Sequence, residues 1–99
     1  MNIRRKTENG TITLELNGEL TALTAEKLSS ELKTAAAETG HLVFDFIGLE
    51  YIASAGLRVL LEAKKLMDSK GGKFTVCNVS QEIMHILDIT GFSDMLDFE

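Results

Sequence analysis

The sequence predicts an α/β domain, with a four-stranded mixed β-sheet packed by about three to four α-helices in the order β-β-α-β-α-β-α. Three observations support this fold class. Two strand-like runs flank an Asn-Gly pair near the N-terminus, which is typical of a β-hairpin. Two later strand patterns each follow a helical repeat, and such β-α-β units require parallel strands joined by a right-handed crossover. A nearly continuous apolar run at residues 42–46 is typical of a central strand.

The N-terminal hairpin is predicted from Asn9-Gly10, because both residues tolerate a positive φ. It joins a strand at residues 3–6 to a second at 12–16, in which apolar and polar side chains alternate. Asn17-Gly18 is then expected to close the second strand and open a connection to residue 23. The first strand therefore lies antiparallel, at an edge of the sheet.

The first helix is expected over residues 24–39, where apolar side chains recur at helical spacing. Thr24 is a plausible N-cap, with Leu23 and Leu28 spaced to form a hydrophobic staple across it. Gly40 stands where a left-handed residue commonly ends a helix.

The second half of the chain repeats this alternation. Residues 42–46 should form a central strand buried on both faces, and residues 47–53 should connect it to a helix that begins at Ser54. That helix ends at Gly71-Gly72. A strand at 73–77 follows, and then a third helix with Ser80 as its N-cap and Gly91 as its terminator. The tail after Gly91 shows no clear periodicity.

Composition limits the function. Ninety-nine residues with 44% apolar content fit one domain, residues 1–99, which we expect to be a monomer. A net charge of −5 argues against a nucleic-acid partner, and the basic run Arg4-Arg5-Lys6 is better explained as protection of an edge strand. No apolar stretch approaches the roughly 20 residues that span a bilayer, and no signal-peptide layout opens the chain. We therefore expect a cytoplasmic protein without a membrane partner.

Metal and catalytic sites are not predicted. His41, Cys77 and His85 lack the paired spacing of metal-ligand motifs, and no glycine-rich loop precedes a helix to cradle phosphates, so neither metal nor cofactor is expected. Cys77 is interpreted as a core thiol. A serine hydrolase would need glycine two residues before Ser54, where the chain has Ile52. We expect no catalytic residue and no enzyme.

Ser54 is the main candidate for function. It follows the central strand and opens a helix, the place where α/β sheets concentrate their binding sites. Ala53, Ala55 and Gly56 around it are small, so the backbone of another protein could approach its hydroxyl closely. The alternative is that Ser54 is only an N-cap and that Gly56 only eases packing. Local features alone leave both readings open.

A family resemblance favours the first reading. The chain resembles, over essentially its whole length, the bacterial anti-sigma factor antagonists built on the STAS domain, which is shared with sulfate transporters. The segments that carry the resemblance are Gly18-Glu19-Leu20, Thr24-Ala25-Glu26, Phe44-Asp45-Phe46, Ile52-Ala53-Ser54-Ala55-Gly56-Leu57 and Thr90-Gly91-Phe92. The Ser-Ala-Gly-Leu element is the most specific of these.

The resemblance implies a partner-switching cycle. The unmodified antagonist binds an anti-sigma factor that is also a serine kinase, and sigma factor is released. The kinase supplies ATP and phosphorylates the serine, here Ser54, and a metal-dependent serine phosphatase removes the phosphate. The partner-binding residues implied are Thr21, Ala22, Leu23, Ala53, Ala55, Gly56, Leu57 and Arg58.

Two positions depart from the usual family pattern. Ala53 and Thr21 stand where family members commonly have aspartate, so two carboxylates are missing from the expected interface. This departure favours an alternative function, a STAS scaffold or regulatory subunit of a transport or stress-signalling complex, in which Ser54 is not phosphorylated.

Overall fold

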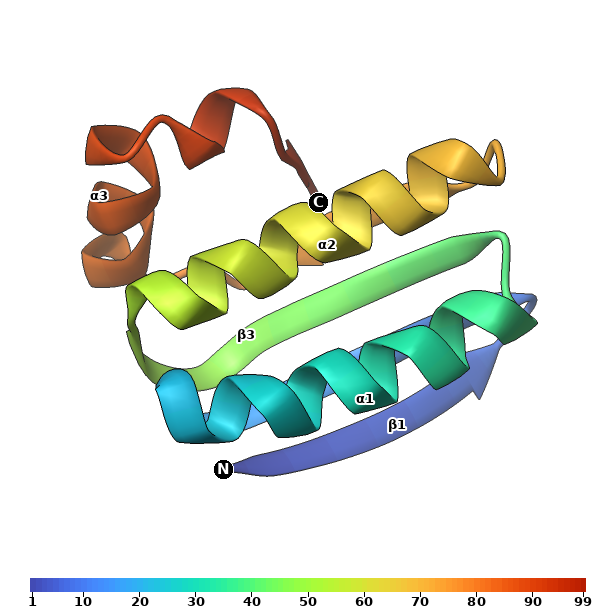
Figure 1. Ribbon diagram of the computed structural model, residues 1–99, viewed down its shortest axis with the longest axis horizontal. Coiled ribbons are helices and arrows are strands. Elements are labelled where there is room, and N and C mark those ends of the chain that lie inside the picture. The colour runs from blue at the N-terminus through green and yellow to red at the C-terminus, as the bar shows by residue number, and fades with distance from the viewer.

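The computed structural model describes residues 1–99 and confirms the α/β class (Figure 1). Two strands precede the first helix, and strands and helices then alternate. The elements are β1 (Asn2–Glu8), β2 (Thr11–Leu20), α1 (Ala22–Glu38), β3 (His41–Ile52), α2 (Ser54–Ser69), β4 (Lys73–Cys77), α3 (Gln81–Ile89), a 3-10 helix (Phe92–Asp94) and β5 (Asp97–Phe98).

The sheet has five strands in the spatial order β1-β2-β3-β4-β5, one more than predicted. β1 pairs antiparallel with β2, and every other neighbouring pair is parallel. The extra strand, β5, is only two residues long and pairs with Thr75 and Val76 of β4. A strand this short has no periodicity to detect, so its signal is absent from the sequence.

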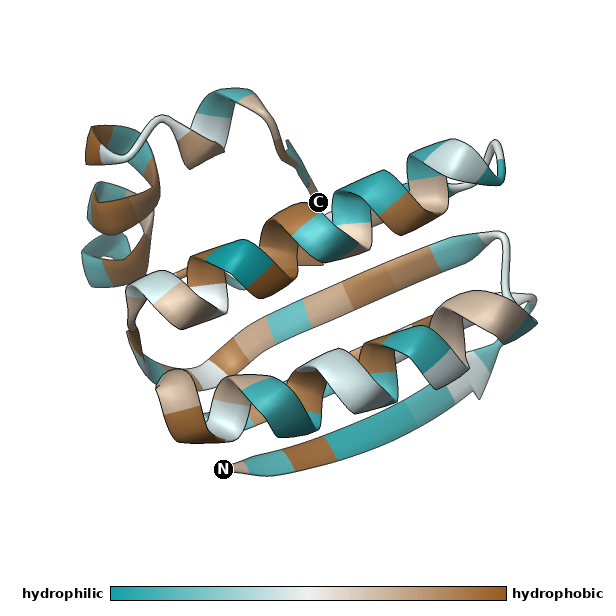
Figure 2. Cartoon of the chain, viewed as in Figure 1, coloured by the Kyte–Doolittle hydropathy of each residue, from teal (hydrophilic) through white to brown (hydrophobic).

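The two long helices α1 and α2 lie side by side across one face of the sheet, whereas α3 stands at one end (Figure 1). Figure 2 shows that much of β3 is apolar and that the edge strand β1 is largely hydrophilic. Leu14, Phe44, Leu28 and Leu60 are fully buried between the layers. No helix covers the opposite sheet face, yet Val43 is only 5% exposed there, so the prediction that β3 is buried on both faces holds at residues 42–44 and fails at the half-buried Asp45.

The start of α1 differs from the prediction. The N-cap is Thr21, and Thr24 is the third helical residue. Leu23 is 84% exposed, so it forms no staple with the buried Leu28. Gly40 does not adopt a positive φ; the end of α1 is held instead by Lys70, whose Nζ donates to the carbonyl oxygens of Ala36 and, at 2.9 Å, Thr39.

The predicted loops after β2 and β3 are strand in the structure. β2 continues through Asn17-Gly18 to Leu20, and β3 continues to Ile52. Register shifts between Glu15 and Asn17 and between Gly18 and Glu19 break the period-two alternation, which is why the pattern hides these strand ends. Gly18 holds a φ of +110° inside the strand.

Other local predictions are confirmed. Asn9 and Gly10 both have positive φ, 51° and 80°, as the predicted hairpin requires. The hydroxyl of Ser80 accepts from the amide of Ile83 at 3.2 Å and caps α3, and Gly91, at φ 82°, follows its end. Separately from these predictions, none of the helices combines the length and the apolar character that a membrane-spanning segment needs.

Candidate functional site

Two strand-to-helix junctions meet at one end of the sheet. Leu20 and Ile52, the last residues of β2 and β3, are register partners. The amide of Ala53 then donates to the carbonyl oxygen of Leu20 at 2.8 Å. Since both strands end here, α1 and α2 begin next to each other at the carboxyl edge, where parallel sheets commonly place their functional groups. The structure thus brings together the two segments that carry the predicted site residues.

Ser54 is the first residue of α2 and is exposed. The N-cap is Ala53, which has no side-chain acceptor, so the interpretation of Ser54 as an N-cap is wrong. The first helical hydrogen bonds run from the amides of Gly56 and Leu57 to the carbonyl oxygen of Ala53. The amides of Ser54 and Ala55 therefore have no backbone acceptor, and the Ser54 hydroxyl is not used for capping.

The start of α1, by contrast, is capped by side chains. Thr21 and Thr24 form a capping box: the Thr24 amide donates to Thr21 Oγ1 at 3.4 Å, and the Thr21 amide donates to Thr24 Oγ1 at 2.8 Å. The Thr24 hydroxyl also donates to the carbonyl oxygen of Glu19 at 2.7 Å. Thr21 therefore orders the junction beside Ser54, and its own hydroxyl is already engaged.

Gly56 is buried against the neighbouring junction. A Cβ added there would lie 2.6 Å from Leu20 Cγ and 2.8 Å from Ile52 Cγ1. The close approach that glycine allows is thus made by side chains of the same chain, and the expectation that Gly56 admits a partner's backbone is wrong. Leu57 is also buried, at 8% exposure. Gly56 and Leu57 fix where α2 starts, and both are buried instead of lying on the surface.

The remaining predicted residues reach solvent around Ser54. Ala22, Leu23 and Arg58 are exposed, and Ala53 and Ala55 are half-buried. Sequence reasoning missed Tyr51, which is 49% exposed and lies in the register opposite Glu19 at the same end of the sheet. An aromatic side chain close before the serine was the available signal.

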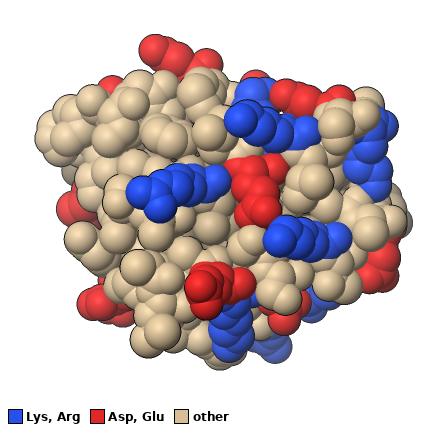
Figure 3. Space-filling model, in the orientation of Figure 1, with Lys and Arg blue, Asp and Glu red and all other residues tan.

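A groove of about 740 Å³ runs between α1 and α2. Ala22 and Ala55 line it near the helix starts, and Arg58, Glu62 and Lys65 line it further along α2. Figure 3 shows charged side chains of both signs over the middle of the helical face and a mostly uncharged surface at the end where α2 begins. The Ser54 end therefore offers small and apolar groups with few charges.

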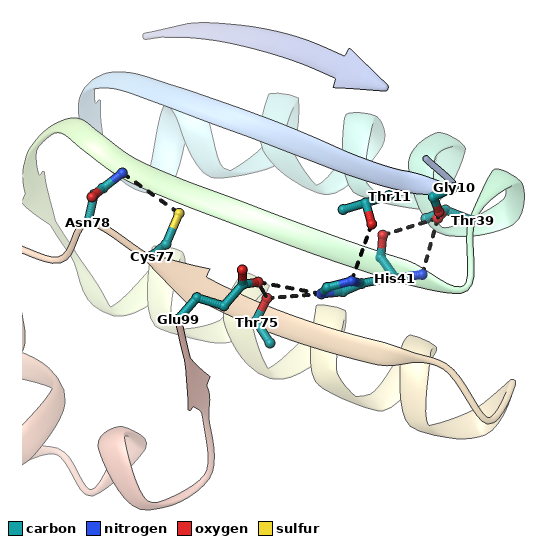
Figure 4. A network of polar contacts seen from close by, with 8 residues as sticks. All are labelled: Gly10, Thr11, Thr39, His41, Thr75, Cys77, Asn78 and Glu99. Carbon is teal, nitrogen blue, oxygen red and sulfur yellow. Dashed lines mark hydrogen bonds and ion pairs between the residues drawn. The ribbon is translucent and has the colours of Figure 1, made fainter. Parts of the chain in front are cut away.

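A second polar cluster lies on the open face of the sheet, around His41 (Figure 4). His41 Nδ1 is 3.3 Å from Thr11 Oγ1, and its Nε2 is 3.2 Å from Thr75 Oγ1 and 3.5 Å from Glu99 Oε2. These contacts tie β2, β3, β4 and the C-terminal residue together. His41 begins β3, whereas Ser54 follows its far end, so this histidine is not placed to act as a base for Ser54.

Cys77 lies on the same open face and is half-buried, so the prediction of a core thiol is wrong. Burial raises the pKa of the Cys77 thiol to about 11, with further contributions from the negative charges of Asp45, Glu99 and Glu15. The thiol therefore stays protonated near neutral pH and is a poor nucleophile. No group of three or more His, Cys, Asp or Glu side chains is arranged to hold a metal ion.

Comparison with known protein families identifies the family of this chain. The family model of the STAS domain matches residues 2–99. The chain belongs to the STAS domain family. Its sequence is 30% identical over 95 residues to the anti-sigma F factor antagonist of Paenibacillus polymyxa, and the match covers 92% of this chain and 81% of that protein. It is 27% identical over 97 residues to the anti-sigma-B factor antagonist of Bacillus subtilis, covering 98% and 89%.

Solved STAS structures agree in fold. The unphosphorylated form of the anti-sigma factor antagonist SpoIIAA superposes with a TM-score of 0.84, at 17% identity and over 99% of this chain and 88% of that one. Its phosphorylated form superposes with a TM-score of 0.77, over 99% and 91%. At this identity the likeness concerns the fold alone.

Proposed function

We propose that this STAS domain is an anti-sigma factor antagonist switched by phosphorylation of Ser54. Unmodified, the monomer binds an anti-sigma factor serine kinase in the cytoplasm through the end of the molecule that carries Ser54. The kinase transfers phosphate from ATP to Ser54, and a serine phosphatase restores binding. The chain serves as adaptor and substrate, and it performs no catalysis itself. The names of its relatives support the antagonist role.

One observation carries the proposal: the Ser54 hydroxyl is exposed at the first residue of α2 and is not used to cap the helix. A serine engaged as an N-cap must release that hydrogen bond, worth about 1 kcal/mol, before its hydroxyl can enter the active site of a kinase. Ser54 has no such bond to lose. Its half-buried neighbours Ala53 and Ala55 leave the hydroxyl sterically accessible to a kinase.

The position of Ser54 also allows phosphorylation to change partner affinity without a large change in the stability of the fold. Phosphate adds a charge of about −1.5 to −2. At the start of α2 this charge meets the positive end of the helix dipole and the free amides of Ser54 and Ala55, so the fold should tolerate it. In a tight interface the same dianion must be desolvated. Partner affinity therefore falls while the free energy of unfolding changes little.

The proposed binding surface is made by the exposed and half-buried groups around Ser54, with the engaged Thr21 and the buried Gly56 and Leu57 as its support. The surface residues are Ala22, Leu23, Tyr51, Ala53, Ser54, Ala55 and Arg58. Leu23 is the more exposed of the two large hydrophobic side chains among them, at 84% against 49% for Tyr51, and burying it would favour association.

Incubation with the candidate kinase and ATP, followed by mass spectrometry, tests the modification. Wild type and a Ser69→Ala control, which removes an exposed serine from the other end of α2, should both carry one phosphate. Ser54→Ala should carry none. Phosphate on the Ser54→Ala chain, or none on wild type, would overturn the assignment.

The scaffold alternative draws on the missing carboxylates at Ala53 and Thr21. The two functions differ in their response to charge at position 54. Ser54→Asp weakens binding to the anti-sigma factor if the switch operates. An affinity equal to wild type, measured by calorimetry, would favour a STAS scaffold whose binding does not depend on this serine.

A further inference from the structure

We propose that Arg58 is the internal counter-ion of phosphorylated Ser54, so that phosphorylation withdraws a free cation from the binding surface as well as adding an anion. This inference rests on the proposed function and concerns the regulation of the same site. It assigns Arg58 two states: available to a partner when Ser54 is unmodified, and paired within the chain when Ser54 carries phosphate.

The spacing of the two residues supports the pair. Ser54 and Arg58 are four residues apart in α2, a helix that continues without interruption to Ser69. Residues at i and i+4 are neighbours on a helix surface, with Cβ atoms about 5–6 Å apart. Both side chains are exposed, so neither must leave a packed position to meet the other. A phosphate on the short serine side chain then lies within reach of the long arginine.

Arg58 has no competing partner in the structure. It forms no ion pair, although four other Lys or Arg side chains do. Glu62, one turn further along α2, lines the same groove but accepts from Ser29 Oγ at 2.7 Å and lies 3.8 Å from Lys33 Nζ. Glu26 of α1 also lines the groove without pairing to Arg58, and the first turn of α2 contains no acidic residue.

The charge change at this surface is a reversal. Before modification, Arg58 contributes one positive charge beside the neutral Ser54. A phosphate of about −1.5 to −2 leaves a local sum of about −0.5 to −1. The planar guanidinium suits bidentate pairing with phosphate oxygens, so the arginine is held as well as neutralised. An acidic group of the partner that contacts Arg58 in the unmodified complex would lose that contact and meet a negative surface instead.

The test places phosphoserine at position 54 during translation, so it needs no kinase. A ³¹P NMR titration then follows the second ionisation of the phosphate in wild type, Arg58→Gln, Arg58→Lys and Lys65→Gln. Lys65 is the matched control because it is exposed, unpaired and in the same groove. It lies 11 residues after Ser54, about 16 Å further along the helix axis.

We expect the titration midpoint of Arg58→Gln to lie about 0.4 pH unit above wild type, the shift that matches one exposed i,i+4 ion pair. The midpoint of Arg58→Lys should rise less than that of Arg58→Gln, and the midpoint of Lys65→Gln should equal that of wild type. Equal midpoints for wild type and Arg58→Gln would overturn the pair. An equal rise in Lys65→Gln would also overturn it, because the effect would then be a diffuse field.

The design separates this inference from the proposed function. A kinase that fails to modify Ser54 would refute the switch, yet the ³¹P midpoints would still report whether Arg58 meets the phosphate. An unshifted midpoint would remove the counter-ion role from Arg58 and leave Ser54 phosphorylation standing. Circular dichroism of each variant verifies the fold, and all three substitutions replace exposed side chains.

Discussion

Replacing Gly56 by alanine tests how the start of α2 is fixed. In an exposed helix this change stabilises by about 1 kcal/mol, because alanine has the higher helix propensity. Here the added Cβ would lie 2.6 and 2.7 Å from Leu20 Cγ and Cδ2 and 2.8 Å from Ile52 Cγ1. Carbon atoms in ordinary contact are about 3.5–4.0 Å apart. The neighbours must therefore move by about 1 Å.

That movement has little space. Leu20 is fully buried and Ile52 is 3% exposed, so both are enclosed by the core. Overpacking of this kind costs about 1–3 kcal/mol, and three contacts below 3 Å place Gly56→Ala near the upper value. After the gain in helix propensity, the free energy of unfolding should fall by about 2 kcal/mol. For a domain of this size the melting temperature should fall by about 10 °C.

Urea denaturation followed by circular dichroism measures this loss, and a Leu20→Ala background supplies the control. Shortening Leu20 removes two of the three close contacts, so adding Gly56→Ala to Leu20→Ala should change the free energy of unfolding by less than about 0.5 kcal/mol. A Gly56→Ala chain more stable than wild type would refute this packing account. An equal loss in both backgrounds would show that Leu20 is not the obstacle.

Three further predictions concern the caps and the open sheet face. Ala53→Asp should raise the free energy of unfolding by about 1 kcal/mol, since it gives α2 the side-chain acceptor it lacks, and an unchanged urea midpoint would contradict this. Thr21→Ala should lower that free energy by about 1 kcal/mol by breaking the capping box; a loss below the error of the same measurement would argue against the box. Cys77, with its pKa raised from 9.0 to about 11, should react with iodoacetamide at pH 8 about tenfold more slowly in the folded chain than in urea. The raised pKa lowers the thiolate fraction roughly hundredfold, but a thiolate of higher pKa is also more nucleophilic, which partly offsets this loss. Equal rates in the folded and unfolded chains would contradict the raised pKa.

Local turn chemistry made much of the fold predictable. Asn9-Gly10, Ser80 and Gly91 act through their own backbone angles or hydroxyl, so their roles can be read without tertiary information. The end of β2 could not be read in this way. Register shifts opposite β3 let the strand pass through Asn17-Gly18, and those shifts depend on pairing between segments distant in sequence. β5 likewise exists only through its pairing with β4.

The candidate site could likewise be predicted only in part from the sequence. Its position after the central strand follows from element order, whereas the spacing of Leu23 and Leu28 predicted a staple and not the exposure of Leu23. The role of Gly56 does not, because its neighbour Leu20 is 36 residues away in the sequence and meets it only when β2 and β3 pair. The free amides at the start of α2 likewise depend on Ala53, rather than Ser54, being the N-cap.

The affinity of the anti-sigma factor for the chain with phosphoserine at position 54, compared by calorimetry with the unmodified chain, tests the central claim most directly. We expect binding of the unmodified chain and an affinity about 10- to 100-fold lower for the phosphorylated one, a loss of about 1.4–2.8 kcal/mol. The melting temperatures of the two forms should agree within a few degrees. Equal affinities for the two forms would contradict the claim that Ser54 is the switch.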